Sequence, residues 1–458
     1  SFFSIFLLGI LSGILALLTP CIFPMIPLTV SFFIKQNQSN RKGIFDALLY
    51  GFFIILIYVS LSLPFHLVDS LNPQILNDLS TSVFLNLIFF IVFIFFAFSF
   101  FGYYELTLPV FFLNKTESKS SISGVIGIFF MSLTLALVSF SCTGPILGSL
   151  LVGSLSINGG AYQLTAGMLG FGISLALPFA MLALFPNLIK NLPKSGTWMK
   201  KFKITLGFIE LALALKFLSN ADLVSGWGFL KREVFILIWL ILSLLLSIYL
   251  LGLVKNTGEK KSNIEKIFGL TSLIFSIYLF NGLVSKENNL KFVSGFTPPV
   301  FYSLFSNTND CPLNLDCYKN FKAAREKAKS QNKPILIDFT GWACVNCRRV
   351  EENIWSNPEV YDILKNKFII SSLYVDDRKK LSPDESFNFK FPDGRIKKIR
   401  TIGEKWSTFQ LQNFNSASQP YYIMIHPNGR ILNYPIQYTS SVNKYRNWLN
   451  KGLDNYGL

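Results

Sequence analysis

Charged side chains and histidines are scarce in this 458-residue chain. Only 15% of its residues are Asp, Glu, Lys or Arg, whereas a soluble domain usually carries about 25%, so an ordinary soluble enzyme is excluded. There are only two histidines, His66 and His426, which argues against a histidine-based metal site or a Ser-His-Asp triad. Disorder is excluded as well, because 51% of the residues are hydrophobic and polar low-complexity tracts are missing.

Eight apolar runs fill the first 285 residues, and each approaches the roughly 20 residues that a spanning helix needs. They cover approximately 2–34, 44–65, 82–105, 124–153, 161–186, 204–219, 233–254 and 267–285. We therefore predict a polytopic α-helical membrane bundle of about eight spans over residues 1–285. A short linker, 286–306, and a globular domain, 307–458, should follow.

The net charge of +16 indicates membrane topology rather than nucleic-acid binding. Each loop after an odd-numbered run carries two to five Lys or Arg residues, whereas the other loops together hold only Lys231 and Arg232. Positive loops stay on the cytoplasmic side, so both chain ends should lie outside. We predict a multi-pass protein of the bacterial inner membrane with periplasmic termini, surrounded by lipid. No motif of a nucleic-acid reader is present.

The composition becomes mixed after the linker, and the pattern there is that of one α/β domain. Buried strands are predicted at 334–340, 368–375 and 421–426, with a turn and a short strand after 426. Helices are predicted at 318–330, 344–355 and 442–451. Strands that alternate with helices are typical of α/β folds.

Cys344 and Cys347 form the strongest local motif. They follow a predicted buried strand and open a predicted helix. At a helix N-terminus the helix dipole favours the thiolate of the first cysteine, which is the attacking species in disulfide exchange. The second cysteine, one turn on, resolves the mixed disulfide. A zinc half-site or a structural bridge is the alternative, but Cys311 and Cys317 are poorly spaced as a second ligand pair.

The segments 338–347 (DFTGWACVNC) and 419–429 (QPYYIMIHPNG) resemble the thioredoxin family over roughly residues 318–458. The resemblance implies that Pro420 is a cis-proline facing the disulfide, where it presents backbone to a substrate. It also implies that Asp338 is a buried carboxylate that assists proton transfer. The sequence departs from the family in two places. The family often has Trp immediately before the first cysteine, but here Ala343 lies between Trp342 and Cys344, and the stretch 376–415 is longer than a minimal thioredoxin needs.

Cys21 and Cys142 form a second pair in the apolar runs. Each lies in a Cys-x-x-Pro segment, TPCIFPMIP (19–27) in the first run and SCTGP (141–145) in the fourth. The prolines, Pro20, Pro24, Pro27 and Pro145, free backbone groups that lipid cannot satisfy. Such segments should face protein or a cavity, and the two thiols could meet as a disulfide. Runs one to three and four to six then read as an inverted repeat. For either cysteine alone, a small buried side chain is the simpler interpretation.

An eight-span core with one cysteine in the first and fourth spans, followed by an outer thioredoxin-like domain, resembles the DsbD-type transmembrane thiol–disulfide reductases. The resemblance implies that cytoplasmic thioredoxin reduces Cys21–Cys142, which then reduces Cys344–Cys347. Periplasmic disulfide proteins or apocytochrome c would be the acceptors. No bound cofactor or metal is expected, because the cysteines carry the electrons. Larger members have an N-terminal immunoglobulin-like domain with its own cysteines, so either a separate protein takes that role here or the segment is missing from this sequence. Because the chain starts at Ser1 within an apolar run, we expect a preceding segment to be removed or missing.

Three other functions remain as alternatives. A quinone-linked generator of oxidant would run electrons the other way, but it usually needs a Cys-x-x-Cys within the bundle. A solute transporter with a redox-regulated outer domain would make Cys21 and Cys142 dispensable. A pure binding or chaperone role of the outer domain would make Cys344 dispensable while Pro420 still mattered.

Weaker signals remain in both parts of the chain. Glu210 and Lys216 lie in or near the sixth run, where charges are costly and often functional. The simpler interpretations are that Glu210 is a cavity-facing carboxylate with a structural role and that the Lys216 side chain extends from a helix end to the membrane surface. Cys311 and Cys317 are predicted to form a structural disulfide in an oxidising compartment, with free thiols or a redox role as alternatives.

Overall fold

The computed structural model divides the chain into two compact units, residues 1–71 with 95–210 and residues 72–94 with 211–458. It describes residues 2–17, 22, 40–63, 81–103, 125–133, 135–136, 160–184, 197–253, 262–284, 290–305, 311–390, 394 and 396–457.

Small residues set the packing of helices in the first unit. Helices α1 (Phe2–Leu17) and α3 (Asn40–Ser60) both pack on α9 (Gly160–Leu184). A Cβ atom added at Gly9 would lie 2.3 Å from the carbonyl oxygen of Gly167, so only glycine permits this approach. The Ser174 hydroxyl also donates to the carbonyl of Ile10 at 2.9 Å. Close backbone contact through small residues is a typical way for helices to associate in a membrane.

Helices occupy the described part of every predicted apolar run. Besides those above, they include residues 125–133, α6 (Val83–Phe100), α11 (Thr197–Ser225), α12 (Arg232–Leu251) and α13 (Asn263–Val284). Three of them, α6, α12 and α13, are long and apolar enough to cross a membrane, and Phe3–Leu17 and Phe45–Ser60 are shorter apolar helices. The helical membrane region is thus confirmed, while the number of eight spans stays a prediction.

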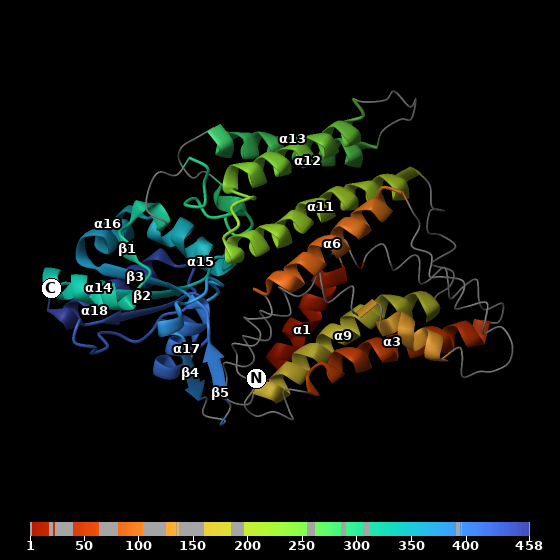
Figure 1. The fold of residues 1–458 in the computed structure, drawn as a ribbon. Coiled ribbons are helices and arrows are strands. Elements are labelled where there is room, and N and C mark those ends of the chain that lie inside the picture. The colour runs from red at the N-terminus through yellow and green to blue at the C-terminus, as the bar shows by residue number, and fades with distance from the viewer. Residues whose placement is uncertain are drawn as a thin grey trace. The chain divides into compact units, whose positions relative to one another are not determined.

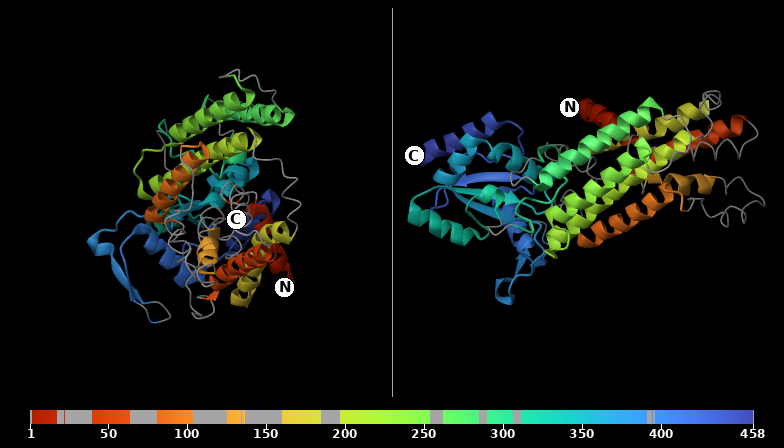
Figure 2. Two further views of the ribbon diagram at one scale, coloured as in Figure 1. Left: turned by 90° about the vertical axis from the view of Figure 1, so that its right-hand side faces the viewer. Right: turned by 90° about the horizontal axis from the view of Figure 1, so that it is seen from above.

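Helices α12 and α13 lie side by side in the second unit (Figures 1 and 2) and are joined by serine hydroxyls. The hydroxyls of Ser243 and Ser272 each donate to the other residue's carbonyl, at 2.9 and 2.8 Å. The Ser276 hydroxyl lies 2.8 Å from that of Ser243, and the Ser247 hydroxyl donates to the Gly269 carbonyl. Polar contacts of this kind tie helices together where lipid offers no hydrogen bonds.

The C-terminal part contains a four-stranded sheet in the order β1-β3-β2-β6. Its strands are β1 (Cys317–Tyr318), β2 (Ile335–Thr340), β3 (Ile369–Tyr374) and β6 (Tyr421–Ile425). Strand β3 runs parallel to both β1 and β2, and β6 runs antiparallel to β2. Asp338 in the middle of β2 is paired with Ser372 of β3 and Tyr422 of β6.

Helices cover both faces of this sheet (Figure 1). Successive residues of a strand point to opposite faces, and both faces carry apolar side chains that the helices bury. Leu336 of β2 packs with Trp355 and with residues of α16 (Pro358–Lys367) and α18 (Val442–Tyr456). Ile337 and Phe339 pack on the other face with residues of α14 (Phe321–Gln331) and α17 (Ile402–Phe414). The result is the expected thioredoxin-like α/β arrangement.

Side-chain caps explain where several of these helices begin. Asn320, Asn357 and Ser441 accept backbone N–H bonds at the starts of α14, α16 and α18. Thr401 and Glu404 form a capping box at the start of α17.

The predicted strands at 334–340, 368–375 and 421–426 are confirmed as β2, β3 and β6, and the predicted helices as α14, α15 (Val345–Val350) and α18. The helix predicted over 344–355 ends at the expected residue, but its second half, Glu351–Trp355, is π-helical. The short strand after the turn consists of isolated bridges at Ile431 and Ile436. Helices α16 and α17 and the hairpin of β4 (Phe387–Lys390) and β5 (Ile396–Ile399) were not predicted.

Candidate functional site

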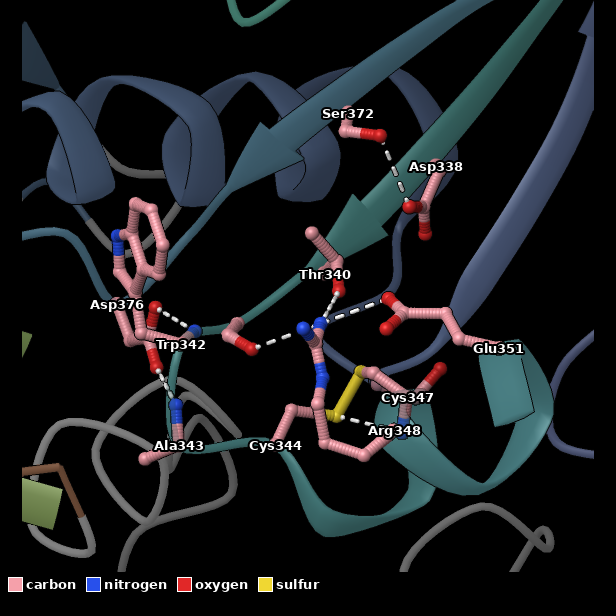
Figure 3. Close-up of a disulfide and its surroundings, with 12 residues drawn as sticks. Asp338, Thr340, Trp342, Ala343, Cys344, Cys347, Arg348, Glu351, Ser372 and Asp376 are labelled. Atoms are coloured by element: carbon pink, nitrogen blue, oxygen red, sulfur yellow. Dashed lines mark hydrogen bonds and ion pairs between the residues drawn. A yellow bond between two sulfur atoms is a disulfide. The ribbon is translucent and has the colours of Figure 1, made fainter. Parts of the chain in front are cut away.

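Cys344 and Cys347 are joined as a disulfide at the start of α15, with their Cα atoms 5.3 Å apart (Figure 3). Cys344 caps the helix, and its sulfur accepts the N–H of Cys347 at 3.1 Å. Cys344 is half-buried, whereas Cys347 is fully buried. The first cysteine is thus the more exposed of the two, and the attacking role of Cys344 and the resolving role of Cys347 stay predictions.

Asp376 fixes the loop that precedes Cys344. Its carboxylate, at the end of β3, accepts the backbone N–H groups of Trp342 and Ala343 at 2.8 and 3.0 Å. Burial raises the pKa of Asp376 to about 6, although the two amide donors oppose the rise. Gly341 is required beside it, because an added Cβ atom would lie 2.8 Å from a carboxylate oxygen of Asp376.

Trp342, whose role the sequence leaves open, stacks on the ring of Tyr374 with centroids 4.1 Å apart. The ammonium of Lys319 lies 5.0 Å from the centroid of Trp342, within the range of a cation–π contact. The indole is therefore held as part of the surface next to the disulfide.

Arg348 is a buried cation directly behind the disulfide, only 3% exposed. Its guanidinium donates to the Glu351 carboxylate at 2.7 Å and to the Thr340 hydroxyl at 3.2 Å (Figure 3). Burial disfavours the charge of Arg348, but Glu351, Tyr374 and Asp338 outweigh this cost and raise its pKa. Arg348 therefore stays charged, and the protonation states of Glu351 and Asp338 determine how much of its charge is neutralised.

Asp338 and Glu351 are buried carboxylates close enough to Arg348 to feel its charge. Burial raises the pKa of Asp338 to about 7, against the opposing effects of Arg348 and a hydrogen bond from Ser372. The second oxygen of Asp338 has no hydrogen-bond partner among the residues that the structure describes. Burial likewise raises the pKa of Glu351 to about 8, with Arg348 opposing and Asp338 adding to the rise. Both groups therefore exchange protons near neutral pH.

The Gln419–Pro420 peptide bond is cis and leads directly into β6. This agrees with the geometry that the thioredoxin resemblance implies. The role of Pro420 in presenting backbone to a substrate stays a prediction.

Cys311 and Cys317 are joined as a disulfide with their Cα atoms 6.1 Å apart. Cys311 is buried, and the bond closes a short loop just before α14. The pairing predicted from the sequence is present, and a purely structural role for it stays a prediction.

The membrane cysteines Cys21 and Cys142 lie outside the described residues, together with the prolines Pro20, Pro24, Pro27 and Pro145. Their predicted meeting, and the inverted repeat, are therefore untested. Glu210 is described and fully buried in α11, and neither of its carboxylate oxygens has a hydrogen-bond partner in the described part of the chain. Lys216, on the same helix, is half-buried.

Arg348, Glu351 and Asp376 were not singled out from the sequence. A signal existed for the first two, because Cys344, Cys347, Arg348 and Glu351 recur at helical spacing and share one face. Nothing in the sequence indicated that Asp376 would accept two loop amides. Among the described residues, no cluster of three or more His, Cys, Asp or Glu side chains is placed to hold a metal ion.

Two family models match the chain. Residues 2–221 match the transmembrane domain of the cytochrome c biogenesis proteins, and residues 316–392 match a thioredoxin-like family. The first match contains Cys21 and Cys142, and the second contains Cys344 and Cys347.

The chain is also similar to curated proteins named thiol:disulfide interchange protein DsbD. It is 28% identical to that of Campylobacter jejuni strain RM1221 over 390 residues, 82% of this chain and 63% of the relative. It is 29% identical to that of Actinobacillus pleuropneumoniae serotype 5b over 81% of this chain and 59% of the relative. For Pectobacterium atrosepticum the values are 26%, 86% and 62%. The match thus covers about three fifths of the length of these relatives.

Proposed function

We propose that this chain, which has the transmembrane domain and the C-terminal thioredoxin-like domain of DsbD-type thiol:disulfide interchange proteins, is a protein-disulfide reductase. It takes reducing equivalents from cytoplasmic thioredoxin through Cys21 and Cys142, passes them to Cys344 and Cys347, and delivers them to periplasmic disulfide proteins or apocytochrome c. It does so in the bacterial inner membrane, with both termini in the periplasm.

Each transfer is a thiol–disulfide exchange with balanced electrons and protons. A donor thiolate attacks one sulfur of the acceptor disulfide, and a mixed disulfide forms as the other acceptor sulfur leaves as a thiolate. The second donor thiolate then attacks the donor sulfur of the mixed disulfide and releases the remaining acceptor sulfur. The donor pair loses two electrons and two protons and becomes a disulfide, and the acceptor pair becomes two thiols. The order is reduced thioredoxin to Cys21–Cys142, then this pair to Cys344–Cys347, then that pair to the substrate.

The charged groups behind the outer disulfide support the second half of this scheme. When the Cys344–Cys347 bond is reduced, the leaving thiolate needs a proton, and on delivery to a substrate the thiol must lose one. Asp338 and Glu351, with pKa values of about 7 and 8, can give and take protons at neutral pH. Arg348 compensates the carboxylates when they are ionised.

One observation carries the proposal: a half-exposed Cys344 bonded to a buried Cys347 at a helix start, over ionisable groups tuned close to neutrality, in a chain with a matching transmembrane domain. A merely structural disulfide needs no such tuning, and perturbed pKa values cluster at functional sites. No bound cofactor enters this scheme, because the cysteines themselves carry the electrons.

The test is the redox state of Cys344 and Cys347 in intact cells, read by thiol alkylation and gel shift. We expect both thiols to be reduced in the wild type and oxidised in Cys142→Ala. The neighbouring substitution Ser141→Ala is the matched control and should leave the pair reduced.

Other outcomes would contradict the proposal. If Cys142→Ala leaves the outer pair unchanged, the two halves are not electronically coupled, and a transporter with a redox-regulated outer domain is favoured. If the outer pair becomes more reduced in Cys142→Ala, electrons run inward, as in a generator of oxidant.

A further inference from the structure

The segment 290–305, which is the described part of the predicted linker 286–306, is fixed to helices α11 and α12. The Arg232 guanidinium at the start of α12 donates to the Thr297 hydroxyl at 3.2 Å and to the Pro298 carbonyl at 2.5 Å. The backbone N–H of Arg232 donates to the carbonyl of Tyr302. Arg232 is only 6% exposed, so its bonds to this segment are shielded from water and correspondingly strong.

Two carboxylates complete the attachment. Asp222, at the end of α11 and only 1% exposed, accepts the Tyr302 hydroxyl at 2.9 Å. Glu233 accepts the Ser303 hydroxyl and, at 2.8 Å, the N–H of Leu304. The segment is therefore held at several points rather than free to swing.

The same segment contacts the thioredoxin-like domain next to its disulfide. The ring of Phe301 meets that of Trp342 edge to face, with centroids 5.9 Å apart. The guanidinium carbon of Arg348 lies 5.2 Å from the centroid of the same ring. Phe301 thus bridges an aromatic residue before Cys344 and the cation after Cys347, and both contacts have favourable geometry.

A second contact lies nearby at Gly295. A Cβ atom added there would lie 2.5 Å from Cγ1 of Val345, the residue directly after Cys344. The backbone of the segment therefore passes against the first turn of α15, and only a residue without a side chain allows this approach.

We propose that residues 290–305 are a docking segment that binds the active-site face of the thioredoxin-like domain through Phe301 and Gly295 and holds that face to the ends of α11 and α12. The occupant of this face is thus a segment of the same chain. A protein that exchanges disulfides with Cys344 has to approach beside Trp342 and Val345, so it must first displace the docking segment. This rests on the proposed function only in that Cys344–Cys347 is the exchange site.

The inference can be tested with the full chain purified in detergent and carrying Cys21→Ala and Cys142→Ala, so that only added reductant reaches the outer disulfide. The probes are reduced soluble thioredoxin and dithiothreitol, and acid quenching followed by alkylation and peptide mass spectrometry gives the rate of reduction of Cys344–Cys347. The docking segment obstructs a protein more than a small dithiol. The rate of reduction by thioredoxin divided by the rate of reduction by dithiothreitol therefore reports on docking, and it rises when the segment is released.

Phe301→Ala should raise this ratio by about 5- to 20-fold, the loss expected for one aromatic and one cation–π contact. Gly295→Val should raise it too, because its side chain forces the segment away from Val345. The control is Phe305→Ala in the same segment, since Phe305 is 82% exposed and should leave the ratio unchanged.

A ratio within about twofold of the starting protein in both Phe301→Ala and Gly295→Val would overturn the inference. An equal rise in Phe305→Ala would overturn it too. An unchanged rate with dithiothreitol shows that a variant is folded. Because the assay omits the membrane cysteines, its result is independent of whether Cys142→Ala affects the outer pair in cells.

Discussion

Asp338 provides the sharpest test of the electrostatics behind the disulfide. Its side chain is 1% exposed, and its pKa rises from 3.8 to about 7 because of burial. A carboxyl group whose pKa is higher in the folded state favours folding when protonated and opposes it when ionised. The contribution of protonated Asp338 to the free energy of unfolding is therefore fully present below about pH 4, decreases as the pH rises, and is lost above about pH 7. Asp338→Asn removes the ionisable group and should stabilise the domain at high pH.

The magnitude follows from the pKa values. A rise from 3.8 to about 7 corresponds to about 4 kcal/mol once Asp338 is fully ionised. About half of this, roughly 2 kcal/mol, is lost between pH 5.5 and 8.5, because protons leave the folded form mainly below pH 7. The free energy of unfolding of Asp338→Asn minus that of the wild type should therefore increase by about 2 kcal/mol over this range.

Pulse proteolysis of the full chain in urea, followed through a C-terminal tag, measures this difference for the thioredoxin-like domain alone. The Cys344–Cys347 bond must be oxidised in both proteins. Asp384→Asn, on an exposed 3-10 turn, is the control and should leave the free energy of unfolding unchanged at both pH values. A difference for Asp338→Asn that is constant from pH 5.5 to 8.5, or that decreases, would refute the reasoning.

Three more predictions concern the same domain. Arg348→Met leaves the Glu351 carboxylate without its buried partner and should cost about 3–5 kcal/mol in urea unfolding at pH 8.5; adding Glu351→Gln should recover more than half. Asp376→Asn removes a charged acceptor of two loop amides and should cost about 1.5–3 kcal/mol, seen as faster amide hydrogen exchange in the loop before α15. Cys311→Ser with Cys317→Ser opens a short loop and should cost about 2 kcal/mol, while dithiothreitol reduces the Cys344–Cys347 bond at an unchanged rate.

The sequence predicted the elements that rest on periodicity. Strands β2, β3 and β6 are short, mainly apolar segments, and a segment of this kind can be predicted as a buried strand without knowing its partner strands. The Cys-x-x-Cys motif placed the disulfide at the start of α15, since its position between an apolar strand and a helix is a local property. The cis bond before Pro420 came from family resemblance, because nothing local distinguishes it.

Long-range contacts could not be predicted from the same patterns. Asp376 and Trp342 are 34 positions apart and meet only because β2 and β3 are neighbours in the sheet. The attachment of the 290–305 segment depends on Arg232 and Asp222. The sequence identified Arg232 only as a loop charge and did not single out Asp222. Helix α17 and the β4–β5 hairpin fall in the stretch 376–415, whose mixed polarity shows no clear period.

The π-helical turn Glu351–Trp355 fixes the number of residues between Cys347 and Pro358. A π turn places one more residue in the helix than an α-helix would use, with bonds from i to i+5. Here it lets the consecutive residues Glu351 and Glu352 both be buried, at 4% and 6% exposure, while Trp355 reaches the core and donates to the Tyr445 hydroxyl. Deleting one residue would restore α-helical winding and turn Trp355 away from Tyr445. Relatives that keep this core should therefore vary in sequence between Cys347 and Pro358 but not in the number of residues.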